Sequence, residues 1–278
     1  MGLRIATNIA SQTVQKNLSQ VSNEGAKELN KLSSGKRISK AADDAAGMAI
    51  ATNLEAQTRG LRQAKRNAND GISLVQTAEG GLNELSNILV RLRELTVQAA
   101  SDTVGDKERG LLDKEYQQLT TEVDRIAEST TFNGTTLLNG ESGTGTLDFQ
   151  VGAFAGEQNQ ISYDADATNA TAGSIGIEGS TVSSKEDAQD NIASIDEAID
   201  TVSGFRANLG AVQSRLQSTV ANLDVQVINQ DNARSVIQDT DVAESSSKLA
   251  ASNVLKNASV ATLAQANSIP NSALRLIG

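Results

Sequence analysis

The sequence predicts a mainly α-helical protein, with a long antiparallel coiled-coil rod of N- and C-terminal helices and a small β-hairpin region at one end. Two runs of apolar heptads predict the rod, one between residues 42 and 99 and one after residue 186. Composition agrees, because the 278 residues include only 2% aromatic residues and one proline. Small side chains let helix axes approach closely, so thin helical packing is favoured over a thick globular core.

Residues 3–33 are predicted to form a weakly amphipathic helix, whose period is broken at Ser33-Ser34-Gly35. Two interpretations stay open for it: a surface helix, or a helix that becomes ordered only when other subunits cover it. Its thin apolar stripe comprises Leu3, Ile5, Ile9, Val14, Leu18, Val21, Leu29 and Leu32.

The strongest pattern begins near residues 41–44, where Asp43 and Asp44 suit the first turn of a helix. A helix from there to residue 99 spans roughly 85 Å at 1.5 Å per residue, and its stripe needs a partner helix. The glycines at 60, 71, 80 and 81 indicate either close helix approach or a bend. The predicted seam residues are Leu54, Leu61, Val75, Leu82 and Leu89.

A loop at 102–105 and a third helix follow, and then a region over 129–184 that is rich in Gly, Thr and Ser. The alternation in Thr146–Val151 is typical of a hairpin strand. We expect a mobile tip near Ala165–Thr171. Residues 42–184 are therefore predicted to contain the rod helices and the β-hairpin region.

The partner helix is predicted over 185–236, with a seam formed by Ile195, Val202, Leu209, Leu216 and Leu223. A weaker apolar pattern closes the chain over 237–278 and includes Leu249, Leu255 and Leu263. Weak apolar patterns at both ends of the chain flank strong heptad patterns on either side of the β region. Because this order is symmetric, the two ends of the chain are expected to run side by side.

Charge favours that pairing. Residues 1–66 hold 11 Lys and Arg against 5 Asp and Glu, whereas residues 186–246 hold 3 against 11. Opposite charge on the two arms favours their association over pairing of like with like. The competing interpretation is that most of these charges are solvated, because exposed ion pairs contribute little.

Composition excludes several classes of function. The chain has no His and no Cys, which excludes a thiolate nucleophile, a His base and the usual zinc ligands, and we predict no catalytic, cofactor or metal site. The net charge of −10 argues against nucleic acid, and the basic run at Arg59, Arg62, Lys65 and Arg66 is interpreted as a coiled-coil flank. No apolar run is long enough for a membrane span or a signal peptide, so we expect no membrane insertion and export without a cleaved signal.

Three stretches closely resemble bacterial flagellins: residues 31–100, which begin KLSSGKRISK, FNGTTLLNG at 132–140, and LGAVQSRLQSTVANL at 209–223. The similarity covers residues 1–140 and 185–278. It implies a non-enzymatic structural subunit that polymerises into the bacterial flagellar filament for motility. It also implies inner-core (D0-like) helices at 1–41 and 237–278, and rod (D1-like) segments at 42–184 and 185–236.

The resemblance implies partners and a location as well. Flagellins leave the cell unfolded through the flagellar export apparatus, with an export chaperone, and meet the filament cap and hook-junction proteins outside. Their terminal segments become paired helices only in the filament. The polymerisation interface is therefore assigned to Ile5, Ile9, Leu18, Val21, Leu249, Leu255 and Leu263.

The segment RELTVQA at 93–99 resembles the flagellin motif that a vertebrate innate immune receptor recognises. It implies contacts through Arg91, Leu95 and Gln98, with Glu115 on the following helix. Axial packing between subunits competes for the same face.

Two further functions stay open beside that of a filament subunit. One is a hook–filament junction protein, against which the RELTVQA and QTAEG motifs weigh. The second is a secreted monomeric ligand of a host receptor or chaperone. A secreted zinc peptidase would need His ligands, which the chain lacks.

Overall fold

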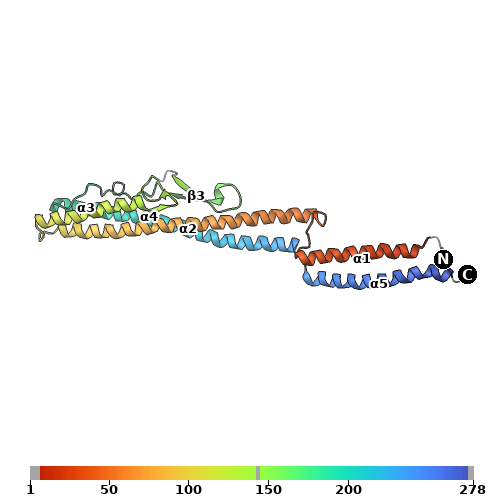
Figure 1. Cartoon of the computed structure of the whole chain (residues 1–278). Coiled ribbons are helices and arrows are strands. Elements are labelled where there is room, and N and C mark those ends of the chain that lie inside the picture. Colours follow the sequence, from red (N-terminus) through yellow and green to blue (C-terminus); the bar gives the residue numbers. More distant parts are fainter. Residues whose placement is uncertain (1–6, 142–144, 275–278) are drawn as a thin grey trace. The chain divides into compact units, whose positions relative to one another are not determined.

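The computed structural model describes residues 7–141 and 145–274, with side chains described as far as Ser268. The chain is mainly helical, as predicted, and its two pairs of short strands are antiparallel. The elements are α1 (Ile9–Ser34), α2 (Ala45–Ala99), α3 (Asp106–Ser129), β1 (Thr131–Phe132), β2 (Thr135–Thr136), β3 (Thr146–Gln150), η1 (Glu157–Asn159), β4 (Gln160–Asp164), α4 (Lys185–Gln238) and α5 (Val242–Leu274) (Figure 1).

The chain divides into two compact units, and the division runs through α2 and α4. Unit 1 comprises residues 1–56 and 229–278, and unit 2 comprises residues 57–228. Each unit therefore combines segments from both halves of the sequence, as the symmetric order of the helices led us to expect.

Unit 1 is built on α1 and α5, which lie side by side and run antiparallel (Figure 1). At one end the Asn8 amide donates to the carbonyl oxygen of Ala266 at 2.9 Å, and Asn8 Oδ1 also caps α1 by accepting from Ser11 N–H. At the other end Gly35, with φ of +69°, terminates α1. There the Thr240 N–H donates to the Gly35 carbonyl oxygen at 3.0 Å, so the two segments are linked at both ends of the pair.

In unit 2, α2 and α4 form an antiparallel coil whose register is marked by ion pairs. Lys65 pairs with Asp224 at 2.6 Å and Arg93 pairs with Asp196 at 2.6 Å. From 65 to 93 along α2, and from 224 back to 196 along α4, the step is 28 residues in both cases, or four heptads. The coil therefore keeps one register over this length.

The predicted seam residues in unit 2 are all buried, and α3 adds Tyr116, Val123 and Ala127 to the same core. Leu54, which lies in unit 1, is half-buried. The buried seam residues are Leu61, Val75, Leu82, Leu89, Ile195, Val202, Leu209, Leu216 and Leu223.

The β region lies along the side of α2, which differs from the predicted position at one end. The β3–β4 hairpin places Phe149 over Gly71, where an added Cβ would lie 3.1 Å from the ring. Ala153 similarly packs over Gly60. Close approach is thus the reason for these two helical glycines. The turn between α2 and α3, rather than the β region, lies at the end of unit 2.

The expectation of a mobile tip near Ala165–Thr171 is wrong, because this segment packs onto the core. Ala165, Thr168 and Ala170 are buried, and the Ala170 N–H donates to the Leu138 carbonyl oxygen at 2.8 Å. Small side chains that are typical of a flexible loop instead let the backbone lie directly against its neighbours.

Candidate assembly surfaces

The helix pair of unit 1 has almost no hydrophobic core of its own. In the described part of this unit the buried apolar residues are Ile38, Ala51 and Ala266, and α1 itself buries only Ser11. Both clusters of buried hydrophobic residues belong to unit 2. Because packing of an apolar face supplies most of the stability of a helix in a protein, the α1–α5 pair is weakly stabilised within one chain.

Unit 1 instead exposes large apolar side chains to solvent. The exposed fraction reaches 57% for Leu29 on α1 and 68% for Val254 on α5. Single exposed apolar residues are common on proteins, but a unit with so small a core leaves many of its large apolar side chains exposed or only half-buried. The exposed residues on these two helices are Ile9, Leu29, Val242, Val254, Leu255 and Val260, which together we call the apolar surface of unit 1.

The predicted polymerisation residues fall into three groups. Ile9 and Leu255 belong to the apolar surface. Leu18, Val21, Leu249 and Leu263 are half-buried, and Ile5 lies outside the described residues. The predicted set omitted Leu29 and Val254, although both belong to the same apolar patterns, because periodicity alone does not show which face a partner helix leaves open.

Polar side chains take up part of the contact between α1 and α5, where a helix pair usually buries apolar side chains. Glu28 Oε1 accepts from Lys31 Nζ at 2.7 Å, and this hydrogen bond is the main reason why the pKa of Glu28 is lowered. On α5 the buried Ser245 hydroxyl lies 2.9 Å from the Thr240 hydroxyl. Ser245 of α5 also forms a hydrogen bond with Glu28 of α1, which links the two helices, but these polar contacts add little apolar burial.

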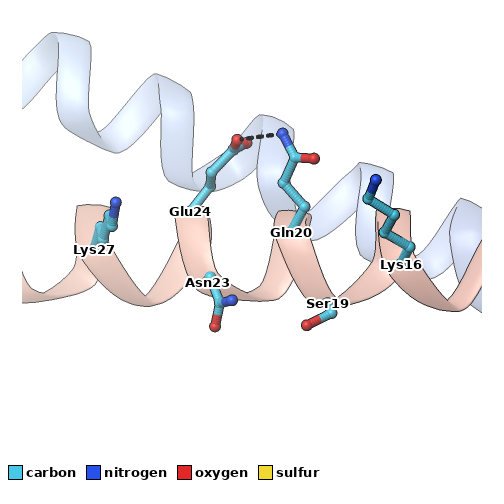
Figure 2. A pocket seen from close by; sticks show the side chains of 6 residues that line it. All are labelled: Lys16, Ser19, Gln20, Asn23, Glu24 and Lys27. Carbon is cyan, nitrogen blue, oxygen red and sulfur yellow. Dashed lines mark hydrogen bonds between the residues drawn. The ribbon is translucent and has the colours of Figure 1, made fainter.

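A shallow hollow on α1 has a polar lining, as Figure 2 shows. In it Gln20 Nε2 donates to Glu24 Oε1 at 3.2 Å. A small-molecule site is normally concave and mostly apolar, and this lining has neither large apolar nor aromatic side chains. We interpret it as an open helix face. The lining residues are Lys16, Ser19, Gln20, Asn23, Glu24 and Lys27, all from α1.

The predicted receptor or axial contact lies on unit 2, where α2 and α3 meet. Arg91 Nη2 lies 2.7 Å from Glu115 Oε1 and Nη1 lies 2.9 Å from Glu94 Oε2, and these hydrogen bonds raise the pKa of Arg91. Gln98 is exposed nearby. Leu95 is fully buried in the core, so its assignment to a surface contact is corrected. The RELTVQA motif combines three buried residues, Leu95, Thr96 and Ala99, with exposed residues on the other face, as expected for a helix.

Neither a metal site nor a membrane span is found in the part of the chain that the structure describes. No group of three or more Asp or Glu side chains there is placed to hold a metal ion. Among the described helices, none is both long enough and apolar enough to cross a bilayer.

Comparison with known proteins identifies the family. Residues 5–143 match the family model for the bacterial flagellin N-terminal helical region, and residues 192–277 match that for the C-terminal helical region. A flagellin of Halalkalibacterium halodurans is 42% identical over 97% of this chain and 98% of its own length. The flagellar filament core protein flaB2 of Brachyspira hyodysenteriae is 40% identical over 98% of this chain and 99% of its own length.

Solved structures agree with that identification. The crystal structure of Bacillus cereus flagellin matches with a TM-score of 0.51 and 29% identity, over 57% of this chain and 88% of that one. A putative flagellar hook-associated protein from Vibrio parahaemolyticus has a TM-score of 0.57 over 70% of this chain and 99% of that one, but at 15% identity it shows the fold alone. With two family models and near full-length relatives in agreement, the chain belongs to the bacterial flagellin family, the structural subunits of the flagellar filament.

Proposed function

We propose that the chain polymerises through unit 1, and that the apolar surface of unit 1 becomes buried against the same unit of neighbouring copies. The observation that carries this proposal is the near absence of a core between α1 and α5, together with the exposed side chains on both helices. Burial of one Leu or Val side chain contributes about 1.5–3 kcal/mol, so several per contact make assembly favourable.

In this proposal residues 1–41 and 237–278 form the inner core of the filament, and residues 42–236 form the rod. The interface includes the predicted residues Ile5, Ile9, Leu18, Val21, Leu249, Leu255 and Leu263, to which the structure leads us to add Leu29 and Val254. Unit 2 has its own hydrophobic core, which supports its folding before assembly.

Leu255→Asp tests the proposal, with Asn257→Asp as the matched control. Both changes add one negative charge to exposed positions of α5, but only the first removes an apolar side chain. We expect Leu255→Asp to keep the helical circular dichroism of unit 2 and to form no filaments in seeded electron microscopy, while Asn257→Asp assembles. Normal filaments from Leu255→Asp would refute the interface, and failure of the unaltered chain to polymerise would refute polymerisation itself.

We propose a non-enzymatic, extracellular filament protein that is exported without a cleaved signal peptide by the flagellar export apparatus and a chaperone, and that meets the filament cap and hook-junction proteins. The absence of His and Cys supports the non-enzymatic part. Mass spectrometry of subunits from isolated filaments tests the export route, because a removed N-terminal segment would contradict it.

A second candidate function is recognition by a vertebrate innate immune receptor, now through Arg91, Gln98 and Glu115 without Leu95. The exposed ion pair between Arg91 and Glu115 favours a polar contact at this place. Axial subunit packing remains the competing use of the same face. Arg91→Ala in the monomer would lower receptor signalling if the receptor contacts this face, and would change filament assembly alone if only subunits do.

A further inference from the structure

The contact between α1 and α5 repeats itself along the helix pair. Four small side chains at seven-residue steps line the least exposed side of α5: Ser245, Ser252, Ser259 and Ala266. Gly25 of α1 faces this row, since a Cβ built on it would lie 3.5 Å from Ser252 Cβ. A shift of α5 by one heptad would place another serine of the row opposite Gly25. Packing along this row therefore does not by itself fix the register of the two helices.

One residue of α5 breaks this repetition, and it is the only proline in the sequence. Pro270 lies inside α5, which continues to Leu274. In an α-helix the N–H of each residue donates to the carbonyl oxygen four residues earlier, and proline has no N–H. The carbonyl oxygen of Ala266 therefore lacks its helical donor, and it is the only position along the chain where a proline has this effect.

Asn8 supplies the missing donor from α1. Its Nδ2 group donates to the Ala266 carbonyl oxygen at 2.9 Å, while its Oδ1 accepts from the Ser11 N–H at 3.0 Å. One amide side chain thus both caps α1 and bonds the carbonyl group that the proline leaves free. Beside it the Ser11 hydroxyl donates to Asn267 Oδ1 at 2.8 Å. We call Asn8, Ser11, Ala266 and Asn267 the terminal clasp.

The terminal clasp opposes a slip of the two helices because its centre is shielded from water. Ser11 and Ala266 are exposed by only 7% and 5%. A buried donor or acceptor that loses its partner destabilises the fold, since water cannot replace the lost hydrogen bond. A slip by one heptad moves α5 by about 10 Å along α1, well beyond hydrogen-bonding distance. Such a slip would separate Ser11 from Asn267 and Ala266 from Asn8.

We propose that Pro270 is a positioning residue that sets the register of α1 against α5, because it frees the Ala266 carbonyl oxygen for Asn8. A single buried polar contact can fix the register of a coiled coil whose other positions repeat. The register in turn decides which side chains of the two helices form the apolar surface of unit 1. This pairing occurs within one chain, so it does not depend on the proposed polymerisation.

Disulfide formation can report the register, because the sequence contains no Cys. Gly25→Cys with Ser252→Cys reports the register of the structure, since a Cβ–Cβ separation of 3.5 Å suits a disulfide. Gly25→Cys with Ser259→Cys reports a slip of one heptad. The effective concentration of each thiol pair is measured against a glutathione buffer in the free full-length chain. We expect the first value to exceed the second at least about tenfold, and we call their quotient the register ratio.

Asn8→Asp separates the terminal clasp from the helix cap. A carboxylate at this position still accepts from the Ser11 N–H, since Asp and Asn cap helices about equally well, but it has no N–H to donate to Ala266. We expect the register ratio to fall about fivefold, which is the effect of one lost hydrogen bond. Asn17→Asp adds the same charge at an exposed position of α1 and should leave the ratio unchanged.

Pro270→Ala tests the role of the proline itself. Alanine restores the N–H, which then donates to the Ala266 carbonyl oxygen within α5 and competes with Asn8. Because alanine favours a helix far more than proline does, helical circular dichroism should stay equal or rise while the register ratio falls about fivefold. The double variant with Asn8→Asp should lie within about twofold of Pro270→Ala alone, because both changes act on one hydrogen bond.

Three results would overturn the proposal. A register ratio that rises together with helix content in Pro270→Ala would show that the proline only weakens α5. Equal ratios in Asn8→Asp and Asn17→Asp would exclude the Asn8 amide as the cause, and additive losses in the double variant would separate it from Pro270. Failure of the unaltered chain to form filaments would instead refute the proposed function, and it would leave the register ratio of the free chain unaffected.

Discussion

The guanidinium group of Arg109 caps the end of α2, since its Nε donates to the carbonyl oxygen of Ala99 at 2.8 Å. Nη2 also donates to the carbonyl oxygen of Ser101 at 3.0 Å, and Nη1 lies 2.8 Å from Asp106 Oδ1. The last carbonyl groups of a helix have no partner within it, and α2 has no basic residue in its last turn. Arg109 supplies that missing charge and connects α2, the turn and α3.

Replacement of Arg109 should loosen this end of unit 2. The side chain is buried, so Arg109→Ala leaves carbonyl groups without donors and should lower the free energy of unfolding by about 2–3 kcal/mol. Arg109→Lys keeps the charge but not the planar set of donors, so it should recover part of the loss. Urea unfolding followed by circular dichroism measures both, and an unchanged midpoint for Arg109→Ala would contradict the capping role.

Two adjacent glycines of α2 should respond to alanine with opposite signs. A Cβ on Gly81 would lie 2.7 Å from both Leu138 Cδ1 and Thr130 Oγ1, whereas a Cβ on Gly80 would meet nothing within 4 Å apart from its chain neighbours and the adjoining backbone of α2. Gly81→Ala should therefore destabilise unit 2 by about 1–3 kcal/mol through crowding. Gly80→Ala should stabilise it by up to about 1 kcal/mol through helix propensity. Thermal unfolding of the two variants compares them directly, and equal effects would show that packing does not decide the difference.

Two consecutive residues of α2 at the seam should also differ in how much they contribute to stability. Leu89 is fully buried in the core, and the next residue, Val90, is about half exposed. Leu89→Ala should cost about 2–5 kcal/mol because it leaves a cavity, while Val90→Ala should change stability by less than about 0.5 kcal/mol. Denaturant midpoints of the two variants are the measurement. A similar loss in both would mean that burial at this seam does not control stability.

Acid should weaken the contact between α2 and α4 at Asp196. The hydrogen bond from Arg93 holds the pKa of Asp196 below its ordinary value of 3.8. A carboxyl group with a lowered pKa in the folded state stabilises that state above its ordinary pKa, and the contribution is lost as pH falls through the lowered value.

Asp196→Asn should therefore be less stable than the unaltered chain at neutral pH, with the difference disappearing in strong acid. Unfolding curves recorded from neutral pH to below 3.8 follow this difference. Asp200→Asn, an exposed acid on the same helix, is the control and should show a smaller difference. A constant gap between Asp196→Asn and the unaltered chain at every pH would exclude the ion pair as its cause.

The helices and the seam residues of unit 2 were predictable from the amino-acid sequence alone. Heptad spacing is a local property, so Leu82, Leu89 and Leu209 could be assigned to one buried stripe without any knowledge of the fold. The break at Ser33-Ser34-Gly35 was also predictable, because glycine readily adopts the left-handed conformation that ends many helices, and Gly35 does so here. The family was also recognisable from the sequence, because its motifs are continuous stretches of residues that can be compared without knowledge of the fold.

Which faces of these helices are covered depends on contacts between segments that are far apart in the sequence. The β region lies beside α2 because Gly71 and Gly60 leave room for Phe149 and Ala153, which are far away in the sequence. Leu95 is buried because segments distant in the sequence pack against it. The large apolar side chains of the unit 1 surface are exposed because no segment of the described chain covers them. Periodicity defines the face of a helix, but its burial depends on a partner that local spacing does not specify.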